Sequence, residues 1–118
     1  MKKIERVESL GRASRIVIHG DTVHVGGVTG RGKDGITAQM TEVLSKIDGY
    51  LAQAGTDKSR LLTAQIWLKD IDRDFEAMNA VWRDWVLPES LPTRATCQAR
   101  LAAPELLVEV IVSAARGE

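Results

Sequence analysis

The chain has 118 residues, and its sixteen basic and sixteen acidic side chains cancel to a formal net charge of zero. The basic residues are also scattered, so the composition gives no electrostatic reason to expect a nucleic-acid or membrane-surface partner. A chain of this length can bury one core without a disulfide or a structural metal, and we expect a single domain over residues 1–118.

The cysteine content and the first residues lead us to expect a soluble, cytoplasmic protein. Cys97 is the only cysteine, which excludes an internal disulfide and is typical of a reducing compartment. Residues 1–6 are charged and lack the apolar segment of a signal peptide. No apolar stretch approaches the roughly 20 residues of a membrane-spanning helix.

Three strands and a helix are predicted for the first half of the chain. Residues 3–7 are expected to form a short edge strand, and residues 15–18 and 22–26 form two more strands around a Gly20-Asp21 turn. A loop rich in glycine follows over residues 28–35.

The first predicted helix begins after Asp34, which we expect to cap it, and ends at Gly55, a residue free to adopt positive φ. Its apolar residues recur at helical spacing, which indicates one buried stripe. They are Met40, Val43, Leu44, Ile47 and Leu51.

The second half is predicted to contain a strand over residues 61–68, a helix capped by Asp74, and two final strands after Pro88 and Pro92 that form a hairpin-like pair. One face of the first of these strands carries Leu62, Ala64, Ile66 and Leu68, and the stripe of the second helix is Phe75, Met78, Val81, Trp82 and Trp85.

The resulting order, βββαβαββ, predicts an α+β fold in which two helices cover one face of a mixed sheet. The other face is left open and is not wholly polar, so we expect self-association to cover it.

The segment from Gly27 to Asp34 is similar to a phosphate-binding loop, since it lies between a strand and a helix. The match fails at Asp34, because a Ser or Thr hydroxyl should follow the lysine there to hold magnesium. We therefore interpret the segment as a flexible loop rather than a nucleotide site.

The remaining reactive side chains give no independent site. His19 and His24 lack neighbours at metal-ligand spacing, so no metal is expected. Cys97 alternates with Ala95 and Ala99, and we expect it to be a small buried residue rather than a nucleophile.

Arg94 and Glu109 are the strongest candidates for a site. Arg94 opens a strand-like run and shares a face with Thr96, and a guanidinium suits a carboxylate ligand. Glu109 stands in the apolar run 107–112, where a lone carboxylate is costly unless it is needed. The alternative is a solvated sheet face on which Glu109 simply pairs with Arg100.

Taken together, the motifs of the chain resemble the Rid family, the reactive intermediate deaminases or YjgF-like proteins, and within it the YoaB-like branch. The resemblance runs from end to end. It rests on Ile18–Val23 with Gly27, Leu61–Asp70, Phe75–Asn79, Pro92–Arg94 and Val108–Val110, and the branch is indicated by Met78-Asn79 with the region from Trp82 to Trp85.

This resemblance implies a homotrimer with a chorismate-mutase-like fold and a cleft between each pair of subunits. It implies hydrolysis of 2-imino or enamine acids to 2-oxo acids and ammonia without a cofactor or a metal. The family pattern assigns the substrate carboxylate to Arg94 and the catalytic water to Glu109. Asn79, Thr96 and the backbone near Gly27 match pocket positions.

The chain departs from the family pattern at three positions. Ala13 replaces the pocket aromatic, Gly26 replaces a small hydroxyl residue, and Thr96 replaces a cysteine. Arg12 and Ser14 flank the first of these and are candidates to reshape the pocket. A second function is therefore kept open, a non-catalytic sensor or adaptor that binds a 2-oxo acid on the same trimeric scaffold.

Overall fold

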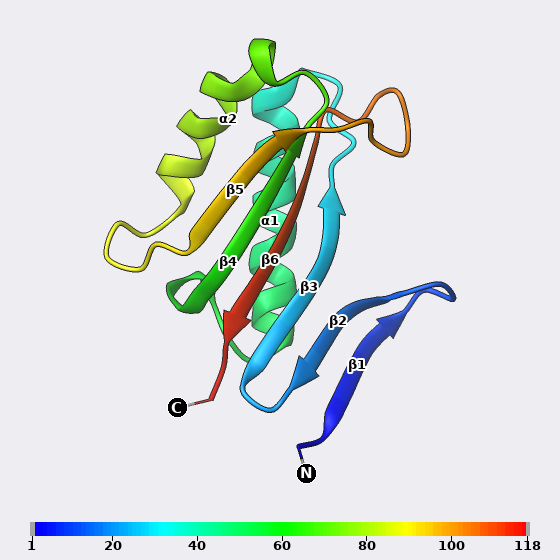
Figure 1. The fold of residues 1–118 in the computed structure, drawn as a ribbon, viewed down its shortest axis with the longest axis vertical. Helices are drawn as coiled ribbons and strands as arrows, with labels where there is room; N and C mark the ends of the chain where they lie inside the picture. The colour runs from blue at the N-terminus through cyan, green and yellow to red at the C-terminus, as the bar shows by residue number, and fades with distance from the viewer. Residues whose placement is uncertain (1, 118) are drawn as a thin grey trace.

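The structure, a computed structural model, describes residues 2–117 and consists of one six-stranded sheet with two long helices on one face (Figure 1). This arrangement and the order of elements confirm the predicted α+β fold. The elements are β1 (Ile4–Ser9), β2 (Ser14–His19), β3 (Thr22–Thr29), α1 (Ile36–Gln53), the short 3-10 helix η1 (Lys58–Arg60), β4 (Leu61–Leu68), α2 (Ile71–Trp85), β5 (Thr93–Gln98) and β6 (Val108–Ala115).

The prediction that the last two strands form a hairpin-like pair is wrong. The sheet order is β1-β2-β3-β6-β4-β5, so β4 separates β5 from β6. β5 pairs with β4 in parallel, and α2 makes the crossover that a parallel pair requires. β6 is antiparallel to both β3 and β4 and lies between them.

The N-caps of both helices differ from the prediction. Gly35, not Asp34, occupies the cap position of α1 and makes no side-chain cap bond. Asp70 caps α2 by accepting a 3.1 Å hydrogen bond from the backbone N–H of Arg73. Asp74 lies inside the first turn instead, where it is 4% exposed and accepts two 2.9 Å bonds from the Arg73 guanidinium. Several acidic residues at this terminus made the position of the cap ambiguous in sequence.

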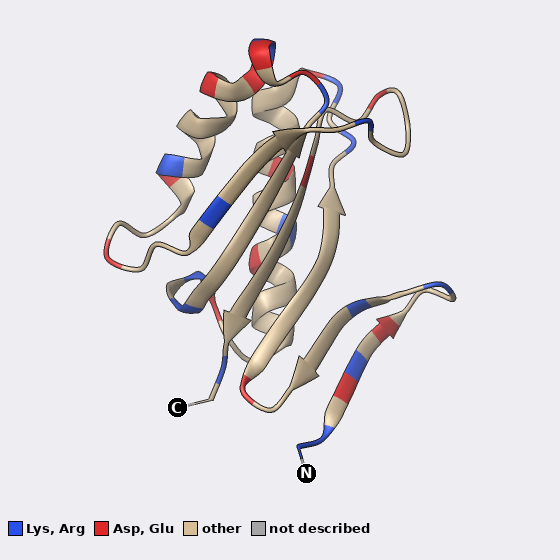
Figure 2. Ribbon diagram, viewed as in Figure 1, with Lys and Arg blue, Asp and Glu red and all other residues tan. Residues whose placement is uncertain are grey.

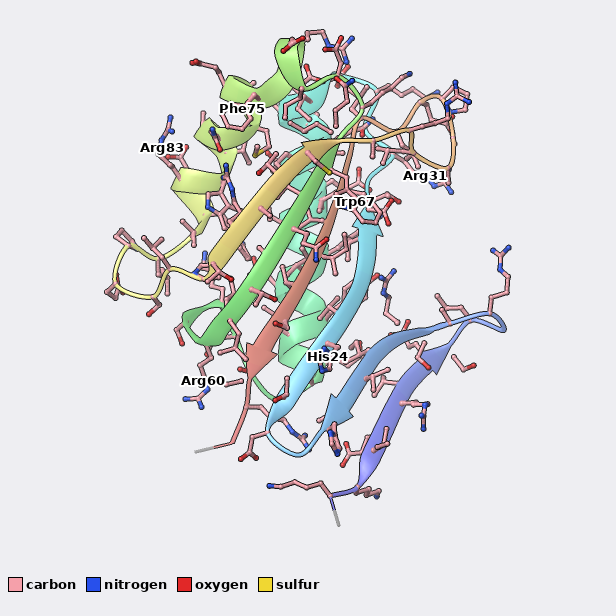
Figure 3. All side chains as sticks on the ribbon, viewed as in Figure 1. His24, Arg31, Arg60, Trp67, Phe75 and Arg83 are labelled. Carbon is pink, nitrogen blue, oxygen red and sulfur yellow. The ribbon has the colours of Figure 1, made fainter. Side chains whose placement is uncertain are left out.

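The core lies between the sheet and the helices. α1 packs against β3, β6 and α2, and every residue of its predicted apolar stripe is buried. Met78 and Trp82 of α2 are buried as well, while Phe75 is 37% exposed on the outer side of this helix (Figure 3). No helix among residues 2–117 is both long and apolar enough to cross a membrane.

Leu62 is the exception to the predicted alternation of β4, since it is 44% exposed. The register of β4 against β6 shifts between Leu61 and Thr63, and this irregularity turns Leu62 away from the helices. Ala64, Ile66 and Leu68 remain buried on the helix face, as predicted.

Gln39 joins α1 to two loops through three hydrogen bonds. Its Nε2 donates to the carbonyl oxygens of Gly32, at 3.0 Å, and Glu105, at 2.8 Å. Its Oε1 accepts from the backbone N–H of Leu107 at 2.8 Å. The side chain is 3% exposed, so these bonds satisfy a buried amide. They tie the loop before α1 to the segment that leads into β6.

Gln39→Glu should lower the free energy of unfolding by about 3 kcal/mol, because it removes both donors and places a carboxylate against two carbonyl oxygens. Chemical denaturation at one fixed chain concentration measures this. Gln53→Glu, at the exposed end of α1, is the control and should change stability by less than about 0.5 kcal/mol. Equal denaturation midpoints for the two variants would show that the Gln39 bonds carry little stability.

Candidate functional site

Glu109 lies on the open face of the sheet, opposite the helices. Val108 and Val110, its neighbours along β6, are both fully buried on the helix face. Glu109 pairs with Thr29 of β3 and with Trp67 of β4, and Figure 3 shows Trp67 at this end of the sheet. β3 and β4 carry no Lys, Arg, Asp or Glu, so Glu109 is an isolated charge on the central strands (Figure 2).

Gly27 and Glu109 lie in close contact. A Cβ atom on Gly27 would lie 2.0 Å from Oε2 and 2.9 Å from Cδ of Glu109, so a side chain at this position would displace the carboxylate. The approach is possible because the register of β3 against β6 shifts between Val25 and Val28. Such an irregularity bends a strand and re-aims its side chains.

Arg15 supports this bulge, although it is not among the site residues predicted from the sequence. Its Nη2 donates a 2.7 Å hydrogen bond to the carbonyl oxygen of Gly27, and its Cζ lies 5.1 Å from the centroid of the Tyr50 ring. The same nitrogen lies 3.0 Å from where a Cβ of Gly26 would stand. The sequence could have indicated this role through Gly26, because a glycine at that position leaves space that another side chain can fill.

Arg94 lies on the other face of the sheet. It pairs with Ala64 in the edge strand β5 and therefore projects towards the helices, where its Cζ lies 5.6 Å from the centroid of the Trp82 ring. Among residues 2–117, no carboxylate lies within ion-pair distance of its guanidinium and no acceptor within hydrogen-bond distance. Burial lowers the pKa of Arg94 from its ordinary value, yet an arginine stays cationic at neutral pH.

Thr96 and Asn79 lie near Arg94. Thr96 pairs with Ile66 and so shares the helix face of β5, and its Oγ1 is buried with no hydrogen-bond partner in the described chain. Asn79 precedes Trp82 by three residues in α2, which places the two on the same side of that helix. Within the described chain neither the Arg94 guanidinium nor the Thr96 hydroxyl makes a hydrogen bond, so both are available to bind a ligand.

The structure of one chain therefore divides the predicted site residues into two groups. Arg94, Thr96 and Asn79 belong to the helix side of the sheet, whereas Gly27 and Glu109 belong to the open side. Two groups on opposite faces cannot hold one small molecule.

The simpler alternative for Glu109 finds no support in this geometry. Arg100 forms no ion pair with Glu109 within residues 2–117; the ion pairs there join Lys46 to Glu42, Arg73 to Asp70 and Asp74, and Arg116 to Glu5.

Cys97 is exposed, so the expectation that it is buried is wrong. Its alternation with Ala95 was predicted correctly, but β5 is an edge strand and this face of it is open. Ala13 and Arg12 are exposed beside β2, and Ser14 begins that strand. Within the described residues no three His, Cys, Asp or Glu side chains gather closely enough to hold a metal ion.

The glycine-rich loop before α1 is occupied by a carboxylate of the chain itself. Oε1 of Glu42 accepts hydrogen bonds from the backbone N–H groups of Arg31, at 2.9 Å, and Gly32, at 3.0 Å. The hydrogen bond from Lys46, together with these amides, lowers the pKa of Glu42. A phosphate would need the same amides, which favours the interpretation of this segment as a loop rather than a nucleotide site.

Comparison with known proteins identifies the family. The chain matches the model of the family described as Endoribonuclease L-PSP over residues 3–116. It is 40% identical over 114 residues to a RutC family protein of Haemophilus ducreyi, covering 95% of this chain and 96% of the relative. It is 38% identical over 112 residues to the RutC family protein YoaB of Escherichia coli, covering 95% and 97%. The chain belongs to this YjgF/Rid family and is YoaB-like, as its motifs predicted.

Solved structures confirm the fold. A YjgF family protein from Neisseria meningitidis superimposes with a TM-score of 0.94 at 34% identity, covering 98% of this chain and 97% of that one. A Pseudomonas aeruginosa protein gives a TM-score of 0.92 at 36% identity, covering 98% and 100%. The six-stranded sheet with two helices on one face is therefore the family fold.

Gly27→Ala should cost about 1–3 kcal/mol of stability, because the new methyl group overlaps the Glu109 carboxylate. Adding Glu109→Ala should relieve the overlap, so that the double variant is more stable than the sum of the single changes by at least about 1 kcal/mol. Thermal and chemical denaturation of the four proteins gives this coupling.

Gly49→Ala is the matched control. A Cβ at Gly49 meets nothing within 4 Å, and alanine favours the middle of α1, so this variant should be stabilised by about 0.5–1 kcal/mol. A purely additive Gly27 and Glu109 pair would contradict the close contact.

Proposed function

We propose that the protein hydrolyses reactive 2-imino and enamine acids to 2-oxo acids and ammonia, in clefts shared between the subunits of a homotrimer. The observation that carries the proposal is the pair of charges without ionic partners in the described chain. Arg94 offers a guanidinium on the helix side of the edge strand, and Glu109 offers a carboxylate on the open face. The YjgF/Rid family membership supports the reaction class.

A second copy of the chain can unite the two groups of site residues. The open face presents Glu109 together with Ile111 and Trp67, and a partly apolar sheet face without a covering layer favours association. If the helix side of β5 from one subunit borders the open face of the next, Arg94 and Glu109 meet across the interface. Closed cyclic symmetry then repeats the cleft three times.

The chemistry needs only groups that this chain supplies. Arg94 holds the substrate carboxylate by two charge-assisted hydrogen bonds, while Thr96 and Asn79 bind the remaining polar atoms. Glu109 takes a proton from a water, whose oxygen adds to the imine carbon, and this proton passes to nitrogen to give a carbinolamine. The proton of the new hydroxyl group then moves to nitrogen as the carbon–nitrogen bond breaks, so that ammonia leaves and the 2-oxo acid remains. Orientation and general-base catalysis each lower the barrier.

Glu109 favours this enzyme over the alternative, a sensor that only binds a 2-oxo acid. Arg94 serves both functions equally, since a guanidinium holds a carboxylate whether or not the bound acid then reacts. A carboxylate facing a bound acid weakens binding, whereas water activation requires it. Cleavage of RNA, which the family description names, fits this chain less well, because its net charge is zero.

Glu109→Gln should lower turnover by about 10²-fold or more while preserving binding of a simple 2-oxo acid, because glutamine keeps the shape but cannot accept the proton. The assay generates 2-imino acids in situ with an amino-acid oxidase and follows their decay with and without the protein. Small, branched and aromatic substrates test whether Ala13 widens the pocket.

Glu105→Gln, an exposed carboxylate in the loop before β6, is the control and should keep full turnover. Wild-type protein that leaves imine decay unchanged but binds the 2-oxo acid would favour the sensor. Equal turnover in the Glu109→Gln variant and the wild type would remove Glu109 as the base.

The protein should be a trimer in solution, with about three times the chain mass of 12.9 kDa by light scattering at micromolar concentration. Ile111→Arg should break this assembly, because it adds a charge to the open face. Phe75→Arg, at an exposed site on α2, should leave it intact. A wild-type monomer would exclude the shared cleft.

A further inference from the structure

Trp82 and Arg94 meet between α2 and the edge strand β5. Cζ of Arg94 lies over the Trp82 ring, 5.6 Å from its centroid. The Trp82 side chain is 7% exposed, and a second indole, that of Trp85, packs against it with a centroid separation of 5.6 Å and an interplanar angle of 47°. The ring that faces the guanidinium is therefore held in place by its own packing.

Arg94 needs such a support, because its side chain is long and has many rotamers. Within residues 2–117 no carboxylate or hydrogen-bond acceptor holds its charged end, and its partner in the sheet is the small Ala64. An arginine that is ordered before the ligand arrives loses less freedom on binding, which strengthens the complex.

We propose that Trp82 is a positioning residue, whose indole face orders the Arg94 guanidinium for two-point binding of the substrate carboxylate. The inference rests on the proposed function, in which Arg94 is the carboxylate clamp. The cation–π attraction is stronger where the cation is shielded from water, and burial lowers the pKa of Arg94 in the direction that such shielding causes. Trp82 acts on binding through Arg94 and takes no part in proton transfer.

The test compares Trp82→Leu and Trp82→Phe with the wild type, using the in situ imine assay and a simple 2-oxo acid as competitive inhibitor. Trp82→Leu should raise both KM and the inhibition constant about tenfold, with kcat changed by less than about threefold. Trp82→Phe should restore most of the affinity, because it keeps an aromatic face. Melting temperature and oligomer mass are measured for each variant.

Trp85→Leu is the matched control. Trp85 donates a 3.0 Å hydrogen bond to Asp48 and packs on Trp82, but it does not contact Arg94 at the distance that Trp82 does. Its loss should reduce stability and, because Trp85 packs beside the ring that faces Arg94 without facing the guanidinium itself, should raise KM and the inhibition constant by less than about threefold, well short of the effect of Trp82→Leu.

A double-mutant cycle separates a positioning role from a purely structural one. In an Arg94→Ala background, Trp82→Leu should lower kcat/KM by less than about twofold more, since the group it acts through is gone. Additive losses, or an unchanged inhibition constant in Trp82→Leu, would overturn the proposal.

The same measurements distinguish failure of the proposed deaminase function from failure of the positioning role of Trp82. A wild type without turnover refutes the deaminase. Binding of the 2-oxo acid is then measured by calorimetric titration, and about tenfold weaker binding to Trp82→Leu still supports the positioning role. A wild type that neither turns over nor binds the acid overturns both.

Discussion

The central position of β6 is the constraint on which the rest of the structure depends. Its alternate residues Val108, Val110 and Val112 point to the helices and fill the core, so the residues between them must point the other way. Glu109 therefore cannot turn inward without moving the whole strand. A one-residue shift of β6 would bury this carboxylate and expose three valines, and the cost of both errors holds the register.

The position of β5 at the edge of the sheet sets the surroundings of Arg94. Among the described residues its one neighbour in the sheet is β4, and Trp82 of α2 lies against Arg94 on its helix side, so its polar side chains are partly shielded but not enclosed. This is the setting in which a guanidinium can remain charged and still be shielded from bulk water. Glu109 thus lies on a central strand and Arg94 on an edge strand, and these positions in the sheet determine how each side chain is oriented and shielded. Neither half is assembled by a loop, which favours a rigid geometry.

Patterns with a short period could be predicted from the sequence, and relations between distant segments could not. The α1 stripe from Met40 to Leu51, the faces of β6 and the motifs around Arg94 all follow local spacing. The position of β6 between β3 and β4 depends on how strands from distant parts of the chain pack together, which local spacing does not show. The predicted hairpin of the last two strands was wrong for this reason. The predicted cap of α2, Asp74, was wrong and the cap is Asp70, because several aspartates lie close together at this end of the helix and the sequence does not distinguish them. Arg15 was missed, since its partner is a backbone carbonyl twelve residues away.

Arg15 and Gly26 share the space beside the bulge of β3. The Nη2 atom of Arg15 lies 3.0 Å from where the first side-chain carbon at position 26 would stand, and the same nitrogen donates to the Gly27 carbonyl oxygen. A side chain at position 26 would therefore require the guanidinium to shift by a few tenths of an ångström, at the expense of that hydrogen bond. Any redesign of this part of the sheet consequently has to treat positions 15 and 26 as a pair.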